Sequence, residues 1–402
     1  MCELSSSGIL LHAGIHRTPV ELSALRFNKQ MEPTMNTTTK QSSLLSSISD
    51  RATELMDFSR YDPSQYIEGY KGRAGYTCLW IPPELLRMGG YQPVLLRGKF
   101  KMSDGNGFEC CRCSSIEDFF TSNSIPDLKF LAIADTCPQI MKTAFRITQT
   151  HDLLLFCIHE PKGQDDESLG KYIHHLNWLR ESVSNSIPES KLEDSFIKAY
   201  AAYCRIRELL EVLRQRNNLP SELYYLLQAV TQTALYELTI PFLEDVVRDT
   251  ETLETISGCP IMIVGGALGL DEIELAEMIS SSGGIVAADL LCNSGRSSAP
   301  PGKLRSNLSF ESLALEYFNR LPCMPVQPNR RFYDHLDHML EDRNIRGVIF
   351  YKPDNCTSYE IEQERIMWKS PVPVLLLDGD FMRLAEKEKK KMISDFIGNI
   401  SL

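Results

Sequence analysis

The sequence lacks any tract of Lys and Arg residues, and its 42 basic and 53 acidic residues give a formal net charge of −11. This balance argues against nucleic acid or an anionic membrane surface as a partner. No apolar run approaches the roughly 18 residues that a membrane-spanning helix needs. The first residues also lack a basic segment followed by an apolar core and a cleavage site. We therefore expect no signal peptide, no membrane association and a cytoplasmic location.

Complete nucleotide-binding motifs are missing as well. Gly265, Gly266 and Gly269 follow a strand-like run, but they form neither a dinucleotide fingerprint nor a P-loop. Asp271 and Glu272 come next and place negative charge where a phosphate would approach a helix N-terminus. A tight structural turn is therefore favoured over a phosphate site.

The sequence is rich in cysteine. Its 402 residues are enough for two or three domains, and 43% hydrophobic with 24% charged residues is ordinary for a globular protein. Twelve cysteines in a chain without a recognisable signal peptide argue against a disulfide framework and favour metal or redox chemistry. Buried free cysteine is also common as a small apolar residue, and this alternative stays open for each of them.

The stretch 346–380 predicts a strand, a helix and a parallel strand. An apolar run at 347–351 is followed by a turn that ends at Cys356, a helix is expected over about 358–369, and a second apolar run covers 372–377. In open parallel sheets, ligands bind at the carboxyl ends of the strands. Cys356 occupies this position.

Other cysteines share this relation to strand-like runs. Cys137 and Cys292 each follow one, and Cys110, Cys111 and Cys113 crowd a single segment. Their spacing matches no compact ferredoxin pattern, and no second Cys-x-x-Cys pair completes a zinc site. Thiols from distant segments can instead converge on one crevice and hold an iron–sulfur cluster, because thiolates are the ligands of such clusters.

The order of patterns predicts an α/β fold with parallel sheets and a helical insertion between two α/β units. We expect a leader over residues 1–65, partly disordered, a first α/β domain over 66–167, a helical region over 168–257 and a second α/β domain over 258–402. Within the leader, Met31 and Met35 are alternative starts of the chain.

Glu84 is the acidic candidate near a strand end. A strand is expected over 75–81, which includes Cys78, and a helix begins after it at Pro82 and Pro83. Acidic residues in a first helical turn are usually stabilised by the helix dipole. A role as a catalytic acid or base requires that this strand end faces the crevice, and both interpretations stay open.

Several short strings occur in an order that resembles a known family. They are Tyr76-Thr77-Cys78 through Pro83-Glu84 to Gly90, Asp135-Thr136-Cys137, Gly283-Gly284 through Asp289 and Cys292 to Gly295-Arg296, Gly347 through Cys356 to Glu360, and Pro373 through Asp378-Gly379-Asp380. Over residues 66–397 this order resembles the 2-hydroxyacyl-CoA dehydratase family, D-component type. The superfamily also contains benzoyl-CoA reductase subunits and double-cubane cluster proteins.

The resemblance implies two Rossmann-like parallel-sheet domains with an iron–sulfur cluster between them, held by three cysteines. Cys137 and Cys356 match two of the ligand positions. The third is Cys113 or, in another register, Cys110, and we take Cys113. The implied cofactor is a [4Fe–4S] cluster, with a double cubane as the alternative.

The resemblance also implies the chemistry and the partners. The reaction is radical elimination of water from a 2-hydroxyacyl-CoA through a ketyl radical, with an activator ATPase as electron donor and a related second subunit or a second copy of the chain. We assign Glu84 as the catalytic residue and keep Cys78 and Cys292 as neighbouring or alternative ligands. A benzoyl-CoA reductase-like or double-cubane reductase, and a non-catalytic paralogue that binds or transfers electrons, are the alternatives. The acyl group is not implied.

Overall fold

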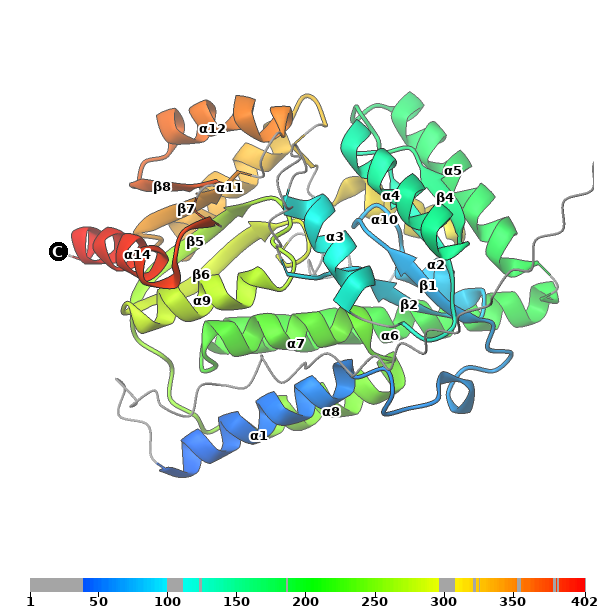
Figure 1. Cartoon of the computed structure of the whole chain (residues 1–402), viewed down its shortest axis with the longest axis horizontal. Helices are drawn as coiled ribbons and strands as arrows, with labels where there is room; N and C mark the ends of the chain where they lie inside the picture. The colour runs from blue at the N-terminus through cyan, green and yellow to red at the C-terminus, as the bar shows by residue number, and fades with distance from the viewer. Residues whose placement is uncertain are drawn as a thin grey trace, which may run out of the picture.

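The computed structural model describes residues 39–99, 111–122, 125–185, 187–295, 308–320, 323–324, 326–352, 356–378, 381 and 383–401. Two parallel sheets lie side by side, and long helices run beneath both of them (Figure 1). Residues 1–38 of the predicted leader lie outside the described residues, as does Cys110.

The first sheet is all-parallel, with the strand order β2-β1-β3-β4. Its strands are β1 (Gly72–Tyr76), β2 (Tyr91–Leu95), β3 (Leu128–Ala134) and β4 (Leu154–Ile158). The helices between them are α2 (Pro83–Met88), α3 (Cys111–Ser122) and α4 (Pro138–His151). The residues of β1 are all buried, as expected for a central parallel strand covered on both faces.

The predicted strand over 75–81 is wrong in its bounds. β1 ends at Tyr76, and the chain then turns, with the Ile81 amide donating to the Cys78 carbonyl at 3.1 Å. Pro82 and Pro83 follow and lead directly into α2. Cys78 therefore lies beyond the strand rather than within it. The apolar run did not predict this, because such a run does not show where the pairing between strands stops.

The second sheet repeats the topology of the first, with the order β6-β5-β7-β8. Its strands are β5 (Cys259–Gly265), β6 (Gly284–Leu291), β7 (Gly347–Tyr351) and β8 (Val374–Leu377). The helices of this half are α9 (Asp271–Ser281), α11 (Arg330–Asp342), α12 (Thr357–Lys369) and α14 (Glu386–Ile400), whereas α10 (Phe310–Asn319) packs against α5 and shares the apolar cluster of the first sheet. The prediction of an α/β fold with two Rossmann-like parallel sheets is confirmed.

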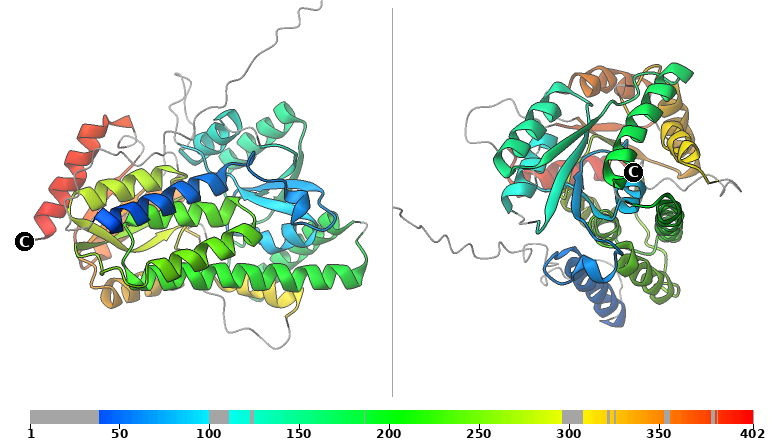
Figure 2. Two further views of the ribbon diagram at one scale, coloured as in Figure 1. Left: turned by 90° about the horizontal axis from the view of Figure 1, so that it is seen from below. Right: turned by 90° about the vertical axis from the view of Figure 1, so that its right-hand side faces the viewer.

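Four further helices form a layer that connects the two halves. They are α1 (Thr39–Met56), α6 (Glu189–Arg216), α7 (Ser221–Thr233) and α8 (Tyr236–Asp249), whereas α5 (Asp166–Ser184) packs against β4 of the first sheet. α7 contacts both β2 and α9, and α1 packs along α7 and α8 (Figure 2). The apolar side chains of α7 are buried between these neighbours. This burial stabilises the helix in a position where it contacts both halves. The domain boundaries themselves stay a prediction.

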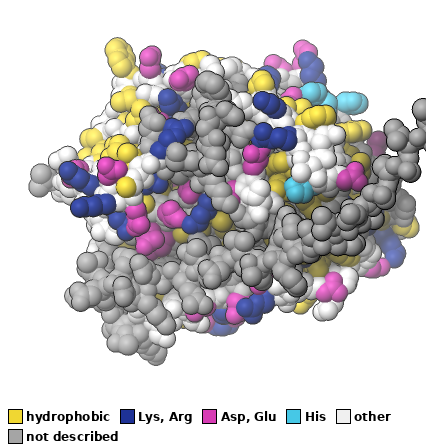
Figure 3. Space-filling view, in the orientation of Figure 1, with side chains coloured by type: hydrophobic (Ala, Val, Ile, Leu, Met, Phe, Trp, Pro, Cys, Tyr) yellow, Lys and Arg dark blue, Asp and Glu magenta, His cyan; other side chains and the backbone are white. Residues whose placement is uncertain are grey.

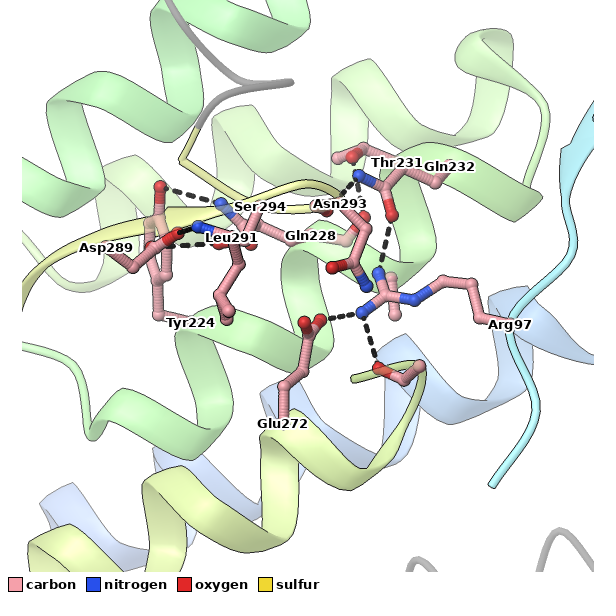
Figure 4. Close-up of polar contacts among 12 residues, drawn as sticks. Arg97, Tyr224, Gln228, Thr231, Gln232, Glu272, Asp289, Leu291, Asn293 and Ser294 are labelled. Atoms are coloured by element: carbon pink, nitrogen blue, oxygen red, sulfur yellow. Dashed lines mark hydrogen bonds and ion pairs between the residues drawn. The ribbon is translucent and has the colours of Figure 1, made fainter. Parts of the chain in front are cut away.

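A buried ion pair joins the two sheets directly. Arg97 follows β2, and its guanidinium pairs with Glu272 in the first turn of α9, with both side chains almost fully buried (Figure 4). The same guanidinium donates to the Gly269 carbonyl at 3.0 Å and to Gln232 Oε1 on α7. Removing one partner of such a pair leaves an uncompensated charge in a medium of low dielectric constant. Arg97 therefore fixes the first sheet against both α7 and α9.

The glycine turn after β5 has a structural requirement for glycine at position 269. Gly269 has φ +65°, and a Cβ atom there would lie 2.3 Å from the Gly98 carbonyl oxygen. The Leu270 amide donates to that same carbonyl at 3.0 Å. The turn therefore needs glycine because the backbone of another segment approaches it closely.

Acidic and basic side chains are interspersed over the described part of the face in Figure 3. Such mixing is typical of an ordinary solvated surface. Among the helices of the described residues, none has the length and apolar character needed to cross a membrane.

Glu222 offers a test of the packing around α7. It lies in the first turn of α7, where Ser280 Oγ donates to its Oε2 at 2.9 Å. Burial, reinforced by Glu277, raises the pKa of Glu222 from 4.5 to about 7. Because the pKa is higher in the folded state, stability falls as the pH rises from about 4.5 to 7. We expect Glu222→Gln to exceed wild type in unfolding free energy by up to about 3 kcal/mol at pH 8.

Urea unfolding at several pH values between 4.5 and 8 measures this difference. The two proteins should be almost equally stable at the lowest pH, where Glu222 is protonated in the folded state and about half protonated in the unfolded state. Glu193→Gln is the control, because Glu193 is exposed on α6. A difference for Glu222→Gln that does not change with pH would contradict the assigned pKa.

Candidate functional site

A cavity that opens to solvent lies between the carboxyl ends of the two sheets. The first sheet contributes Thr77 and Cys78 after β1 and Leu95 at the end of β2. The second contributes Ala267 after β5 and Cys292 after β6. Ligands of parallel α/β sheets bind at such ends. One thiol from each half therefore lines the same cavity.

Helices α6 and α10 complete the wall. Tyr203, Arg207 and Leu210 line the cavity from α6, at spacings of four and three residues that place them on one helix face. Tyr317 lies on α10, and Arg320 caps the C-terminal end of the same helix. The Arg320 guanidinium stacks over the Tyr317 ring at 3.7 Å from its centroid. With Tyr76 at the end of β1, two cations and three phenols line the cavity, and the rest of the lining is uncharged.

Glu84 lies directly behind this wall. Its side chain is fully buried, Arg207 Nη1 donates to Oε1 at 3.1 Å, and the Tyr317 hydroxyl donates to Oε2 at 2.6 Å. The adjoining strand end faces the cavity, as a catalytic role requires. The Glu84 carboxylate itself does not line the cavity; it contacts Arg207 and Tyr317, which do. The prediction that Glu84 is an acid–base catalyst stays a prediction.

A second carboxylate balances the remaining cation. Glu316 accepts hydrogen bonds from Arg320 Nη2 at 3.2 Å and from the Tyr200 hydroxyl at 2.7 Å, and Arg207 Nη2 lies 3.9 Å away. We call Glu84, Arg207, Glu316 and Arg320 the Arg–Glu cluster. Burial alone would lower the pKa of Arg207, but the carboxylate of Glu84 raises it above its ordinary value. The guanidinium therefore stays charged.

Only one feature of the sequence indicates this cluster. Tyr200, Tyr203 and Arg207 fall on the apolar stripe of α6, where a charged residue is unexpected. A buried charge requires a partner, but nothing in the local pattern identifies Glu84 or Glu316 as that partner.

The predicted cysteine ligands lie in different places. Cys137 is the N-cap residue of α4, and Cys113 on α3 is buried in the apolar cluster against which Cys137 also packs. Cys356 is the N-cap residue of α12 and packs with a separate apolar cluster that contains Tyr359. The Tyr359 hydroxyl lies 3.5 Å from Cys292 Sγ, so α12 connects the surroundings of Cys356 to the cavity.

The chemistry of these thiols suits an iron–sulfur cluster. Cys137 and Cys356 are partly exposed at helix N-termini, and cysteine is the residue type that holds such clusters. Within the described residues, no three His, Cys, Asp or Glu side chains are arranged as a metal site. The structure thus places Cys113 with Cys137, and Cys78 with Cys292, but it does not bring Cys113, Cys137 and Cys356 into one ligand group.

Comparison with known proteins gives one match. The sequence profile of the family described as 2-hydroxyglutaryl-CoA dehydratase, D-component, covers residues 78–400, which is more than half of the chain. No match was found among curated proteins. The matched segment contains Glu84 and the whole of the second sheet. It also includes all residues that line the cavity except Tyr76 and Thr77.

The buried pair of Glu84 and Arg207 predicts a large effect on stability. Glu84→Gln removes the nearest carboxylate and leaves the Arg207 charge buried, which should lower the free energy of unfolding by about 3 kcal/mol or more. The double variant Glu84→Gln, Arg207→Met removes the charge as well, and should recover much of the loss. Urea unfolding of the three proteins measures both effects.

An exposed pair provides the matched control. Lys191 and Glu68 form an ion pair at 2.9 Å in which both side chains are solvent-accessible, so Glu68→Gln should leave stability unchanged. Equal stability of Glu84→Gln and wild type would show that the Arg207 charge does not depend on Glu84.

Proposed function

The chain belongs to the 2-hydroxyglutaryl-CoA dehydratase D-component family, and on this basis we propose that it is an iron–sulfur subunit of a 2-hydroxyacyl-CoA dehydratase-type enzyme. The observation that carries the proposal is the cavity between the carboxyl ends of two parallel sheets, with a thiol from each half in its lining. The proposed reaction removes water from a 2-hydroxyacyl-CoA by a radical route. One electron is supplied and then returned, so that the products are the 2-enoyl-CoA and water without net oxidation or reduction.

We propose Cys113, Cys137 and Cys356 as ligands of a [4Fe–4S] cluster. Such a cluster supplies one-electron transfer and a Lewis-acidic iron when it is bound. The support from this chain is the position of Cys137 and Cys356 at helix N-termini that follow β3 and β7. Cys78 and Cys292, which line the cavity, are the alternative thiols.

The other residues of the wall would orient the substrate and exclude water. Burial raises the pKa of Tyr317 well above its ordinary value, with Arg320 opposing this effect and Glu84 reinforcing it, so the phenol stays protonated. Arg207 and Tyr317 are both held by hydrogen bonds to Glu84. We therefore propose that Glu84 acts on the reaction through these two groups, as a positioning residue.

The family description names a component, which implies that a partner component exists. We propose an activator ATPase as the electron donor and a related subunit, or a second copy of this chain, as the structural partner. The proposed substrate is an acyl-CoA thioester bound in the cavity.

The test is anaerobic purification of the full chain, with quantitation of iron and acid-labile sulfide. We expect about four irons per chain for a single [4Fe–4S] cluster, and loss of this iron in Cys137→Ala and in Cys356→Ala. Cys259→Ala is the matched control because Cys259 begins β5, at the opposite end of the sheet from the cavity. It should retain the iron.

The remaining outcomes separate the alternatives. About eight irons per chain would indicate a double cubane. Loss of iron in Cys78→Ala and Cys292→Ala, with iron retained in Cys137→Ala and Cys356→Ala, would transfer the ligand role to the cavity thiols. No iron after anaerobic reconstitution would overturn the cluster proposal.

A further inference from the structure

The charges around the cavity are already balanced. Among the described residues that line it, the cations are Arg207 and Arg320, and each is paired with a buried or nearly buried carboxylate, Glu84 or Glu316. The side chain of Glu84 is 0% exposed and that of Glu316 is 17% exposed. The Arg–Glu cluster thus contains two positive and two negative charges and is neutral as a whole.

The rest of the cavity wall favours an apolar ligand. Much of it is aliphatic, from Leu79, Ile81, Leu95, Ile206 and Leu210. Apolar lining with a few placed polar groups is typical of sites that bind an uncharged organic group. Burial of such a group removes apolar surface from water without requiring a counter-charge.

A ligand with a terminal carboxylate does not suit this site. It would bring a third negative charge next to two guanidinium groups that already have carboxylate partners. The surplus charge would be buried without compensation, which is one of the most unfavourable changes a protein interior can undergo. The family description names a glutaryl thioester, whose acyl group ends in such a carboxylate.

We propose that this chain selects 2-hydroxyacyl-CoA substrates whose acyl group is apolar and uncharged, and that the Arg–Glu cluster rejects acyl groups with a terminal carboxylate. The inference rests on the proposed function, since it takes the cavity as the place where the acyl group of a CoA thioester binds. It assigns Glu316 as the residue that determines this specificity, because Glu316 neutralises Arg320 at 3.2 Å.

The assignment of Glu316 predicts a gain of binding. Glu316→Gln keeps the size of the side chain but leaves two guanidinium groups with one carboxylate, Glu84. A carboxylate on the ligand would then restore neutrality instead of disturbing it. A residue with a purely structural role would weaken the binding of all acyl groups alike, so a reversal of preference distinguishes the two roles.

Two thioesters of matched shape make the test. Glutaryl-CoA and 5-methylhexanoyl-CoA differ only in that two methyl groups replace the two carboxylate oxygens, and neither carries the 2-hydroxyl group that the reaction removes. Their dissociation constants for the full chain, purified anaerobically, are measured by calorimetry. We expect wild type to bind 5-methylhexanoyl-CoA at least about tenfold more tightly than glutaryl-CoA. In Glu316→Gln, the ratio of the two dissociation constants should fall at least about tenfold.

Glu311→Gln, an exposed substitution in the first turn of α10, is the control and should keep the wild-type ratio. Equal binding of the two thioesters to wild type, or tighter binding of glutaryl-CoA, would overturn the inference while acyl-CoA binding itself stands. Binding of neither thioester to the folded chain would overturn the acyl-CoA function and the inference with it. An unchanged ratio in folded Glu316→Gln would overturn the assignment of Glu316. If Glu316→Gln does not fold, Arg320→Gln tests the cluster instead, because it leaves the cluster with a net negative charge and should increase the wild-type preference.

Discussion

Buried ion pairs join the two halves of the structure through helices α6 and α9, and the position of the cavity depends on them. Arg97 reaches from the end of β2 to Glu272 on α9, and Arg214 of α6 pairs with Asp289 of β6. Each of these side chains is largely shielded from water, so each charge needs its partner within hydrogen-bonding distance. Such pairs contribute little net stability compared with apolar packing, but they disfavour any arrangement in which the partners separate. The position of one sheet relative to the other is therefore set by the reach of a few side chains.

The repeated topology explains why this constraint matters for the site. Both sheets have the same strand order, with the first strand of each in an interior position, so the carboxyl ends of β1 and β5 can face each other across a single space. Helix α7 contacts elements of both halves, and α6 contributes Arg207 to the cavity and Arg214 to the second sheet. The helical region is thus part of the site, because α6 carries one cation at the cavity and another at the second sheet.

Local patterns in the sequence were sufficient for the fold and insufficient for the cluster. Period-two and period-3.6 patterns depend on neighbours along the chain, so they predict β7 and α12 closely. The pairing of Arg207 with Glu84 joins residues 123 positions apart, and no local pattern contains that information. The same limit applies to the thiols. Their positions at strand ends follow from the order of the elements, whereas the grouping of Cys78 with Cys292 depends on how the two sheets meet.

The neutrality of the Arg–Glu cluster bears on the reaction as well as on the choice of substrate. In the proposed reaction the thioester oxygen gains negative charge after one electron is added, whereas a terminal carboxylate on the acyl group carries its charge throughout. The Tyr317 hydroxyl donates its only hydrogen to Glu84, whereas Arg207 uses Nη1 for this contact and keeps further N–H donors that are oriented before substrate binds. Preorganised groups in a site of low dielectric constant stabilise a charge that develops in the transition state without first reorganising. A carboxylate that is already charged in the ground state would compete for the same groups. It would reduce the difference between the stabilisation of the transition state and that of the ground state. The neutral cluster therefore presents oriented N–H donors to a charge that develops only during the reaction, but no unpaired counter-charge to a carboxylate that must be buried throughout.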